Sequence, residues 1–365
     1  MNSGAAGVQV QPPAQTAIAR GPWAARHPGQ RSFVSRWLGA IRIRHVIVLA
    51  AVLVYPWVAS PFFTFQIGGQ ALALGLIALS LTFLAGYGGM VSLAQMTIAG
   101  MAGYVTAIFG TSVQAQISLG WPWWLVLAIA VVVPTINAAF IGWLSVRTSG
   151  IYTIMITLAF GVAFYYFCLQ NYTIFNGFQG FHEVLPPAVF GVDWRQPIPY
   201  YYLALGCALA GYFFVKYLVR APFGLSLQGV RDNARRMNAL GYNVTAHRVV
   251  AYAVAGALAS IGGVLMVWYN SLIAPGSVGT GALLTILIIA VLGGMRHPIG
   301  AFLGAIVFVL LQNFAIDLLG TAYRERFNTV IGLVFLLIVA FSQDGLLGWW
   351  TTVRGRFGAR PKKVG

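Results

Sequence analysis

Glycines and small polar side chains cluster in the stretch GYGGMVSLAQMT, Gly86–Thr97. Two kinds of chemistry use such a cluster: a loop that binds phosphate through its backbone N–H groups, and a polar path through a membrane protein. A dinucleotide-binding loop is excluded, because Val91 stands where G-x-G-x-x-G needs its third glycine. A Walker A loop is excluded too, since none of the three lysines follows a glycine. We therefore expect no nucleotide-binding loop in this chain.

The cluster fits the second use, a polar path. Three glycines stand where one apolar run ends, and a serine, a glutamine and a threonine follow at once. Irregular backbone at membrane depth persists only where it is buried in protein or lines an aqueous cavity. An ordinary polar turn accounts for the same residues equally well, so both interpretations stay open. The candidate pathway residues are Gly86, Tyr87, Gly88, Gly89, Ser92, Gln95 and Thr97.

Membrane-spanning helices are the elements that would position these residues. The chain is 59% hydrophobic and only 8% charged, whereas soluble proteins carry roughly 25% charged residues. This composition predicts an all-α, polytopic membrane protein. A spanning helix needs roughly 20 residues, and ten apolar runs fit: 45–63, 66–86, 92–111, 121–144, 151–170, 200–218, 249–270, 281–295, 299–318 and 328–344. The run 281–295 is short, so we expect it to be tilted, broken or only partly inserted.

The net charge of +16 is concentrated in three places. Six arginines precede His45, five basic residues follow residue 353, and most of the others lie between Lys216 and Arg248. An even number of spans places all three clusters in the cytoplasm, as the positive-inside rule requires. Nucleic-acid binders instead gather their charge on a folded face or stripe. We expect both termini in the cytoplasm, contact with membrane lipid, and no nucleic-acid partner.

Composition divides the chain into three regions. Residues 1–44 are rich in Ala, Gly, Gln, Pro and Arg without apolar periodicity, which predicts a disordered basic cytoplasmic tail. Residues 45–350 form the transmembrane domain, with a cytoplasmic loop over 219–248. Residues 351–365 form a second basic cytoplasmic tail.

Ionisable side chains are almost absent from the predicted spans, and Asp317 and Asp344 lie at span ends. Proton- or ion-coupled carriers usually need buried carboxylates or histidines near the midplane, so we expect any pumping to be powered from outside the spans. Cys168 and Cys207 have no CxxC spacing, and the histidines are scattered singly. We expect neither a metal nor a cofactor. No HExxH motif or nucleophile–base pair is present, which makes a membrane enzyme the least favoured class.

Small residues recur at helical spacing in three spans. The rows are Ala99, Gly103, Ala107 and Gly110; Ala253, Ala257, Ser260 and Gly263; and the GxxxG pair Gly300 and Gly304. In lipid, such faces let two helix backbones approach closely and gain van der Waals contact. We therefore expect helix–helix contacts at these rows.

A second polar segment follows the fifth span, in NYTIFNGFQGF, Asn171–Phe181. It places amides, a threonine and glycines among aromatic side chains. An interfacial aromatic belt with turns explains this composition. The alternative is a gate that receives a polar solute from outside.

The cytoplasmic loop contains a predicted amphipathic helix over 226–240. Leu227, Val230, Ala234 and Met237 recur at helical spacing and form one apolar stripe. We expect Asp232 and Arg236 to pair one turn apart, and Gly241 to end the helix. A helix resting on anionic lipid is one explanation. Docking into a groove of a partner protein is favoured, because the stripe lacks Trp or Phe and the basic face is interrupted by a carboxylate and asparagines.

Five stretches of the chain together resemble one known family. They are GYGGMVSLAQMTIAGMAGYVTA, RTSGIYTIMITLAFG, LQGVRDNARRMNALGYNV, AVLGGMRHPIGAFLGA and FSQDGLLG. The first is similar to the family pattern G-x-x-G-x-x-S-L-G-x-A, and the third to a coupling loop of the form A-I-R-D-x-x-x-A-x-x-x-G-x-x-V. The family is the M-type permease subunit of bacterial branched-chain amino acid ABC importers, and the resemblance covers roughly residues 45–350.

This resemblance implies a bacterial inner-membrane permease that forms half of a translocation pathway. The implied partners are an H-type permease, two cytoplasmic ABC ATPases and a periplasmic solute-binding protein, so ATP hydrolysis lies in separate subunits. The implied ATPase-coupling residues are Gly229, Val230, Arg231, Asp232, Arg235, Arg236 and Gly241. Further pathway candidates are Tyr152, Thr153, Thr157, Asn176, Gly177, Gln179 and Gly180.

Two departures from the family pattern bear on the solute. The family commonly has S-L-G-H-A where Ser92–Met96 reads SLAQM, and a T-G-G-x-x-G run where Thr173–Gly180 reads TIFNGFQG. The same branch includes permeases for urea and short amides, so such a solute is the alternative to a branched-chain or related amino acid. An ATP-independent channel or secondary carrier is a further alternative, which the glycine-rich, charge-poor spans motivate.

Overall fold

The computed structural model describes residues 43–112, 118–148, 150–187 and 191–319, together with four isolated positions, 332, 336, 345 and 348. The chain divides into a short unit, Met1–Val54, and a large unit, Tyr55–Gly365. Helix α2 (Ile43–Val58) crosses this boundary and contains Pro56. All other described elements belong to the large unit.

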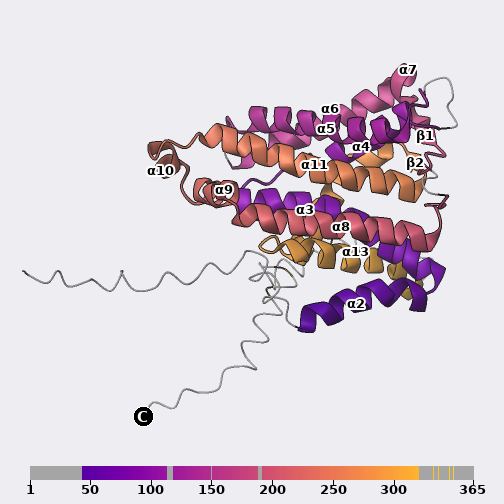
Figure 1. Cartoon of the computed structure of the whole chain (residues 1–365). Coiled ribbons are helices and arrows are strands. Elements are labelled where there is room, and N and C mark those ends of the chain that lie inside the picture. Colours follow the sequence, from indigo (N-terminus) through magenta and orange to yellow (C-terminus); the bar gives the residue numbers. More distant parts are fainter. Residues whose placement is uncertain are drawn as a thin grey trace, which may run out of the picture. The chain divides into compact units, whose positions relative to one another are not determined.

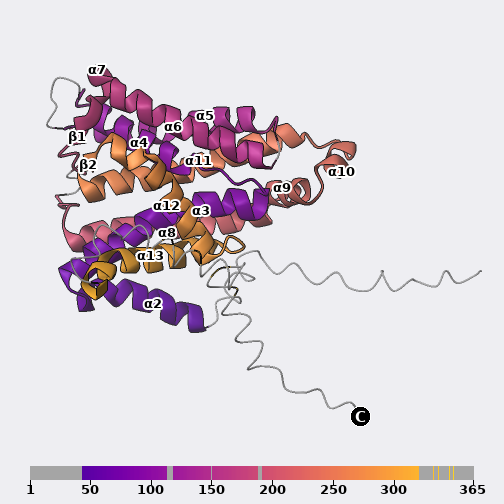
Figure 2. The same cartoon turned by 180° about the vertical axis from the view of Figure 1, so that it is seen from behind.

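The large unit is a set of long helices with shorter elements at both ends. Its elements are η2 (Phe63–Gly69), α3 (Gln70–Gly88), α4 (Gln95–Phe109), α5 (Trp123–Ser145), α6 (Ile151–Gln170), α7 (Tyr172–Phe175), η3 (Gly177–Gln179), β1 (Phe181–His182), α8 (Pro197–Arg220), α9 (Pro222–Asp232), α10 (Ala234–Ala239), α11 (Val244–Asn270), β2 (Leu272–Ile273), η4 (Pro275–Val278), α12 (Thr280–Gly293) and α13 (Pro298–Leu319). The long helices run side by side, with α9 and α10 at one end and α7, β1 and β2 at the other (Figures 1 and 2).

Nine of the ten predicted apolar runs coincide with helices, and α6 has the predicted limits of 151–170. The tenth run, 328–344, lies outside the described residues apart from Gly332 and Leu336. Five of the described segments are long and apolar enough to cross a membrane: Phe63–Gly88, Trp123–Ser145, Ile151–Gln170, Pro197–Arg220 and Val244–Asn270. The all-α, multi-span class is therefore confirmed.

The short run at 281–295 is one arm of a sharp bend. Helices α12 and α13 meet at 115° across a break of four residues, where Gly294 has a φ of +97°. The two arms pack tightly because Gly300 and Gly304 lie against the backbone of Gly293. The contact expected of the GxxxG pair is thus confirmed, and a Cβ at either position would meet backbone atoms.

Helix α3 lies at the centre of the large unit. In the most apolar stretch of the segment Phe63–Gly88, which includes α3, 83% of the residues are buried. The corresponding fraction is 28% in α6 and in α8. It packs against α11, α13, α8 and α12, and glycines make the contacts close: Gly262 meets Ile77 and Gly211 meets Leu76. Helices α5, α6 and α8 expose many large apolar side chains, as expected of surfaces that face lipid or another protein.

Helices α4 and α11 cross through the predicted small-residue rows. A Cβ at Gly263 would clash with the backbone of Ala99, and one at Gly103 would clash with the side chain of Val267. The close helix packing expected at each of these rows is confirmed for these residues, and the two rows contact one another at Ala99 and Gly263.

The end of the large unit opposite α9 and α10 contains a two-residue antiparallel ladder. Phe181 of β1 pairs with Ile273 of β2. Gly180, with a φ of +66°, lies against the Ile273 carbonyl and leaves no room for a side chain. The Asn176 amide donates to the Gly180 carbonyl at 2.6 Å. The glycines of the segment 171–181 therefore shape a folded turn that supports β2.

Candidate functional site

The glycine cluster forms the end of α3. Gly89 is its C-cap residue with a φ of +67°, and the Gly89 N–H donates to the Leu84 carbonyl. A left-handed C-cap favours glycine, because a Cβ there crowds the neighbouring carbonyl. Gly86 lies against the carbonyl of Met295, in the α12–α13 bend. The cluster is thus both a turn and a point of close contact between α3 and that bend.

Arg231 of α9 reaches this same turn. Its Nη1 donates to the Gly86 carbonyl at 2.5 Å, and a Cβ on Gly89 would lie 2.5 Å from the Arg231 Cγ. The Nη2 of Arg231 also pairs with an Asp232 carboxylate oxygen at 2.8 Å. The Gly86 carbonyl belongs to the last turn of α3, the negative end of its helix dipole, which favours a cation. Arg231 therefore joins α9 to the C-terminus of α3; we call this the Arg231 contact.

The prediction of a single helix over 226–240 is wrong. The helix breaks at Asn233, whose φ is −155° and whose side chain accepts the Arg236 N–H and caps α10. The predicted Asp232–Arg236 pair is wrong for the same reason, because the break separates the two residues and Asp232 pairs with Arg231. The helical spacing of apolar residues continues across Asn233, so the sequence pattern alone did not indicate the break.

The two short helices divide the predicted coupling residues into inward and outward groups. Leu227 and Val230 are fully buried, and Met237 packs against Gly229. Asp232, Arg235 and Arg236 are exposed. The segment is thus anchored by its apolar side and displays charge on the other.

Gly241 ends α10 as predicted. Its φ is +88°, and the following Tyr242 N–H donates to the Met237 carbonyl at 3.1 Å. This is the hydrogen-bond pattern of a glycine-terminated helix. The exposed charges of α10 are therefore held on a terminated helix of defined length.

A buried polar cluster follows the glycine turn, where α3, α4 and α6 meet. The Ser80 hydroxyl donates to Gln95 Oε1 at 3.0 Å, and the Leu93 N–H donates to Thr157 Oγ1 at 3.1 Å. Within the described residues, Gln95 Nε2 and Thr97 Oγ1 have no hydrogen-bond partner although both are buried. An unpaired buried donor costs about 1–3 kcal/mol. The cluster retains unused hydrogen-bonding capacity in an apolar environment.

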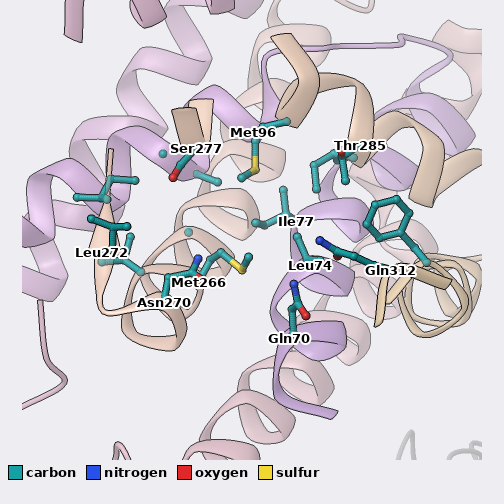
Figure 3. Close-up of a pocket in the computed structure, with 18 residues that line it drawn as sticks. Gln70, Leu74, Ile77, Met96, Met266, Asn270, Leu272, Ser277, Thr285 and Gln312 are labelled. Atoms are coloured by element: carbon teal, nitrogen blue, oxygen red, sulfur yellow. The ribbon is translucent and has the colours of Figure 1, made fainter. Parts of the chain in front are cut away.

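A cavity of about 220 Å³ lies on the other side of α4, between α3, α4, α11, α12 and α13. Five polar side chains line it: Gln70, Asn270, Ser277, Thr285 and Gln312. Aliphatic side chains and methionines fill the wall between them, and none of the lining residues is charged. Figure 3 shows the amides of Gln70, Gln312 and Asn270 beside Leu74, Ile77 and Met266. We call this space the amide cavity.

A family model described as "Branched-chain amino acid transport system / permease component" matches residues 63–339, which is most of the chain. The chain belongs to this family. Its function class is therefore that of a transport permease rather than an enzyme.

Three curated relatives are similar to this permease at low identity. The high-affinity branched-chain amino acid transport system permease protein LivM of Salmonella typhimurium is 22% identical over 347 residues, which cover 89% of this chain and 80% of the relative. The LivM protein of Escherichia coli is 24% identical over 302 residues, 76% of this chain and 67% of the relative. The autoinducer 2 import system permease protein LsrC of Photorhabdus laumondii is 25% identical over 259 residues, 69% of this chain and 73% of the relative. No solved structure matches the permease.

The permease brings together only some of the predicted pathway residues. Ser92, Gln95, Thr97 and Thr157 lie in one buried cluster. Tyr152 is instead 65% exposed.

Gly86–Gly89 lie at the end of α3, directly before this cluster, and the other predicted pathway residues lie elsewhere. Thr153 bonds to the Thr148 carbonyl, and the segment 176–180 belongs to the turn beside β1 at the opposite end. Within the described residues, no three His, Cys, Asp or Glu side chains come together as metal ligands.

The amide cavity was not predicted from the sequence, since none of the predicted pathway residues lines it. A signal was present, because Gln70 and Gln312 are amides inside or beside apolar runs. Polar side chains within spans are expected to face a partner helix or a cavity. Gln70 and Gln312 are far apart in the sequence, so nothing in the sequence indicated that they line the same cavity.

Proposed function

We propose that this permease forms half of the translocation pathway of a bacterial ABC importer for branched-chain or related amino acids. Its partners would be an H-type permease, two cytoplasmic ATPases and a periplasmic solute-binding protein, in the inner membrane. The family match and the similarity to the two LivM proteins support this assignment. ATP hydrolysis belongs to the ATPase subunits, and no cofactor is needed in this chain.

The observation that carries the mechanism is the Arg231 contact. An ATPase that binds the exposed charged side chains of Asp232, Arg235 and Arg236 would move α9 and α10 together. Buried Leu227 and Val230 transmit this movement to the long helices, and Arg231 transmits it to the end of α3. Gly229 and Gly241 act here as packing and terminating residues. The glycine turn is therefore the place where ATPase movement reaches the membrane domain.

The pathway side of the proposal rests on the buried polar cluster. Alternating access would open this cluster to each side in turn, and the unpaired groups on Gln95 and Thr97 supply hydrogen bonds to a passing solute. Tyr152 and Thr153 lie toward the α9 end, and the turn at 176–180 lies at the outer end. Asn176, Gly177, Gln179 and Gly180 serve as the outer rim in this proposal.

We place α9 and α10 in the cytoplasm, together with both basic tails, 1–44 and 351–365. Ten spans over 45–350 give this arrangement, in agreement with the positive-inside rule. The exposed apolar side chains of α5, α6 and α8 then face lipid or the partner permease.

A charge-reversal experiment tests the coupling proposal. The double variant Arg235→Asp and Arg236→Asp should reduce co-purification of the ATPase subunits and ATP-driven leucine uptake by about tenfold or more, since like charges across an interface cost several kcal/mol. Arg195→Asp is the control, because it reverses one positive charge at the opposite end and should preserve both. Unchanged association and uptake in the double variant would contradict the assignment.

Uptake into liposomes by the purified chain alone separates the two classes of mechanism. The importer proposal predicts no accumulation of leucine without ATPase subunits and ATP. Accumulation by the chain alone would establish a channel or secondary carrier instead. Uptake of urea or propionamide by the complete importer, in preference to leucine, would identify the short-amide alternative.

A further inference from the structure

The amide cavity lies toward the end of the molecule opposite α9 and α10. Gln70 begins α3 and Asn270 ends α11, both at that end (Figure 1). Leu272 of β2 forms part of its wall. The cavity extends from there to Ile77 and Met96, so it enters the body of the membrane domain.

The polar side chains of the cavity are poorly matched within the protein. Within the described part of the chain, Asn270, Ser277 and Gln312 form no side-chain hydrogen bond, and Gln70 has only a 3.5 Å contact with the Tyr269 hydroxyl. Thr285 bonds to a carbonyl of its own helix. Asn270 and Gln312 are exposed, and Gln70, Ser277 and Thr285 are partly buried. Polar side chains within spans are expected to face a partner helix or a cavity, and these side chains are free to hydrogen-bond a ligand that enters the space.

Two helix ends reinforce this polarity. Helix α11 ends at Asn270, and Ala282 of the first turn of α12 also lines the cavity. Helix termini carry partial charges of roughly +0.5 at the N-terminus and −0.5 at the C-terminus. One end of each sign therefore borders the space, which favours a dipolar solute over one with a net charge.

The apolar part of the wall defines the rest of the solute. Leu74, Ile77, Met266, Ile286 and Phe308 line the cavity, and methionine adapts readily to irregular apolar shapes. Among the described residues, no ionisable side chain lines the cavity, so a net charge would enter without a counter-charge and its desolvation would be unfavourable. The volume of about 220 Å³ is below the roughly 300–1,000 Å³ of sites for drug-sized ligands. The space therefore suits a small molecule.

We propose that the amide cavity is a solute-binding site built entirely by this subunit, and that it takes a small, net-neutral, dipolar solute with an aliphatic part. Gln70, Asn270 and Gln312 bind the polar head group, and the Leu74–Ile77 side receives the aliphatic part. This inference rests on the proposed import function and adds a site that needs no residue from a partner permease.

The first test is equilibrium binding of radiolabelled L-leucine to the purified full chain in lipid nanodiscs, without partner subunits. Saturable binding is expected, with unlabelled L-leucine competing and L-lysine and L-glutamate failing to compete. Gln312→Leu should weaken binding about tenfold, as expected for loss of a head-group hydrogen bond. Asn313→Leu is the matched control, because Asn313 bonds to the Val309 carbonyl and does not line the cavity.

A second measurement does not depend on affinity. In a chain whose Cys168 and Cys207 are replaced by serine, Ser277→Cys should react with a thiol reagent, and saturating L-leucine or propionamide should slow that reaction. Absence of saturable binding, equal binding by wild type and Gln312→Leu, or equal competition by L-lysine would each overturn the proposal.

The failures of the two proposals are distinguishable. ATP-driven uptake that is normal in Gln312→Leu, together with no binding by the chain alone, would remove the cavity proposal and leave the importer intact. Leucine binding at the cavity together with ATP-independent accumulation would contradict the importer proposal and leave the cavity proposal intact.

Discussion

Replacing Arg231 by glutamine should uncouple ATP hydrolysis from transport without releasing the ATPases. The side chain makes a charge-assisted hydrogen bond to the Gly86 carbonyl, a class worth about 1.5–3 kcal/mol. Its ion pair with Asp232 adds at most about 1 kcal/mol, because the two side chains are 37% and 67% exposed. Because Arg231 is partly exposed, solvent weakens its hydrogen bond. We therefore assign about 1–1.5 kcal/mol of stabilisation to the Arg231 contact between α9 and α3.

A loss of that size corresponds to roughly a tenfold change in the population of the joined state. The assay is a complete importer in proteoliposomes, in which leucine uptake and ATP hydrolysis are measured together. The number of leucine molecules moved per ATP should fall by up to about tenfold in Arg231→Gln, while ATPase co-purification stays at the wild-type level.

Arg235→Gln is the informative comparison for this experiment. Arg235 is exposed and belongs to α10, which packs on α9 and α11, so its substitution should weaken ATPase association and leave the ratio of transport to hydrolysis unchanged. A wild-type ratio in Arg231→Gln would refute the reasoning that the Arg231 contact transmits movement.

Three further substitutions test packing and capping, with thermal unfolding or hydrogen exchange of the purified chain as the measurement. Gly89→Ala should lower the Tm more than Gly120→Ala, because both have positive φ but only Gly89 has a neighbour, Arg231, where the Cβ would go. Asn233→Ala should raise the amide exchange rate of α10 about fivefold, since a lost N-cap costs about 1 kcal/mol; unchanged exchange would contradict the capping assignment. Gly304→Leu should separate α12 from α13 and prevent stable folding, whereas Gly206→Leu, with open space around its Cα, should be tolerated; equal Tm values would contradict this packing.

Helix limits could be predicted well where composition alone sets them. Helix α6 has its predicted bounds because Gly150, with a φ of +64°, and Asn171 end it on either side. The break at Asn233 could not be predicted from periodicity, because the apolar spacing of Leu227, Val230, Ala234 and Met237 continues through it. A capping side chain decided the local structure there.

The candidate site was harder to predict, because it is formed by residues that are far apart in the sequence and come together only in the fold. Ser92, Gln95 and Thr97 are close in sequence and remained together with Thr157. Gln70 and Gln312 are separated by most of the chain, and only the packing of α13 on α3 brings them to one cavity. Local patterns reveal which side chains are polar, and the three-dimensional arrangement determines which of them meet.

Helix α11 spans 27 residues, about 40 Å at 1.5 Å per residue, which exceeds a bilayer core of about 30 Å. Its first turns begin just after α10 and its last residue, Asn270, borders the amide cavity. Between them, Gly256 and Gly263 hold it against Ala138 and Ala99 through contacts too short for side chains. Tyr252 also packs on Gly142 near one end of α11, and Val267 packs on Gly103 near the other. Since α11 is held along most of its length, a displacement at its α10 end would be carried to the cavity end by one continuous helix.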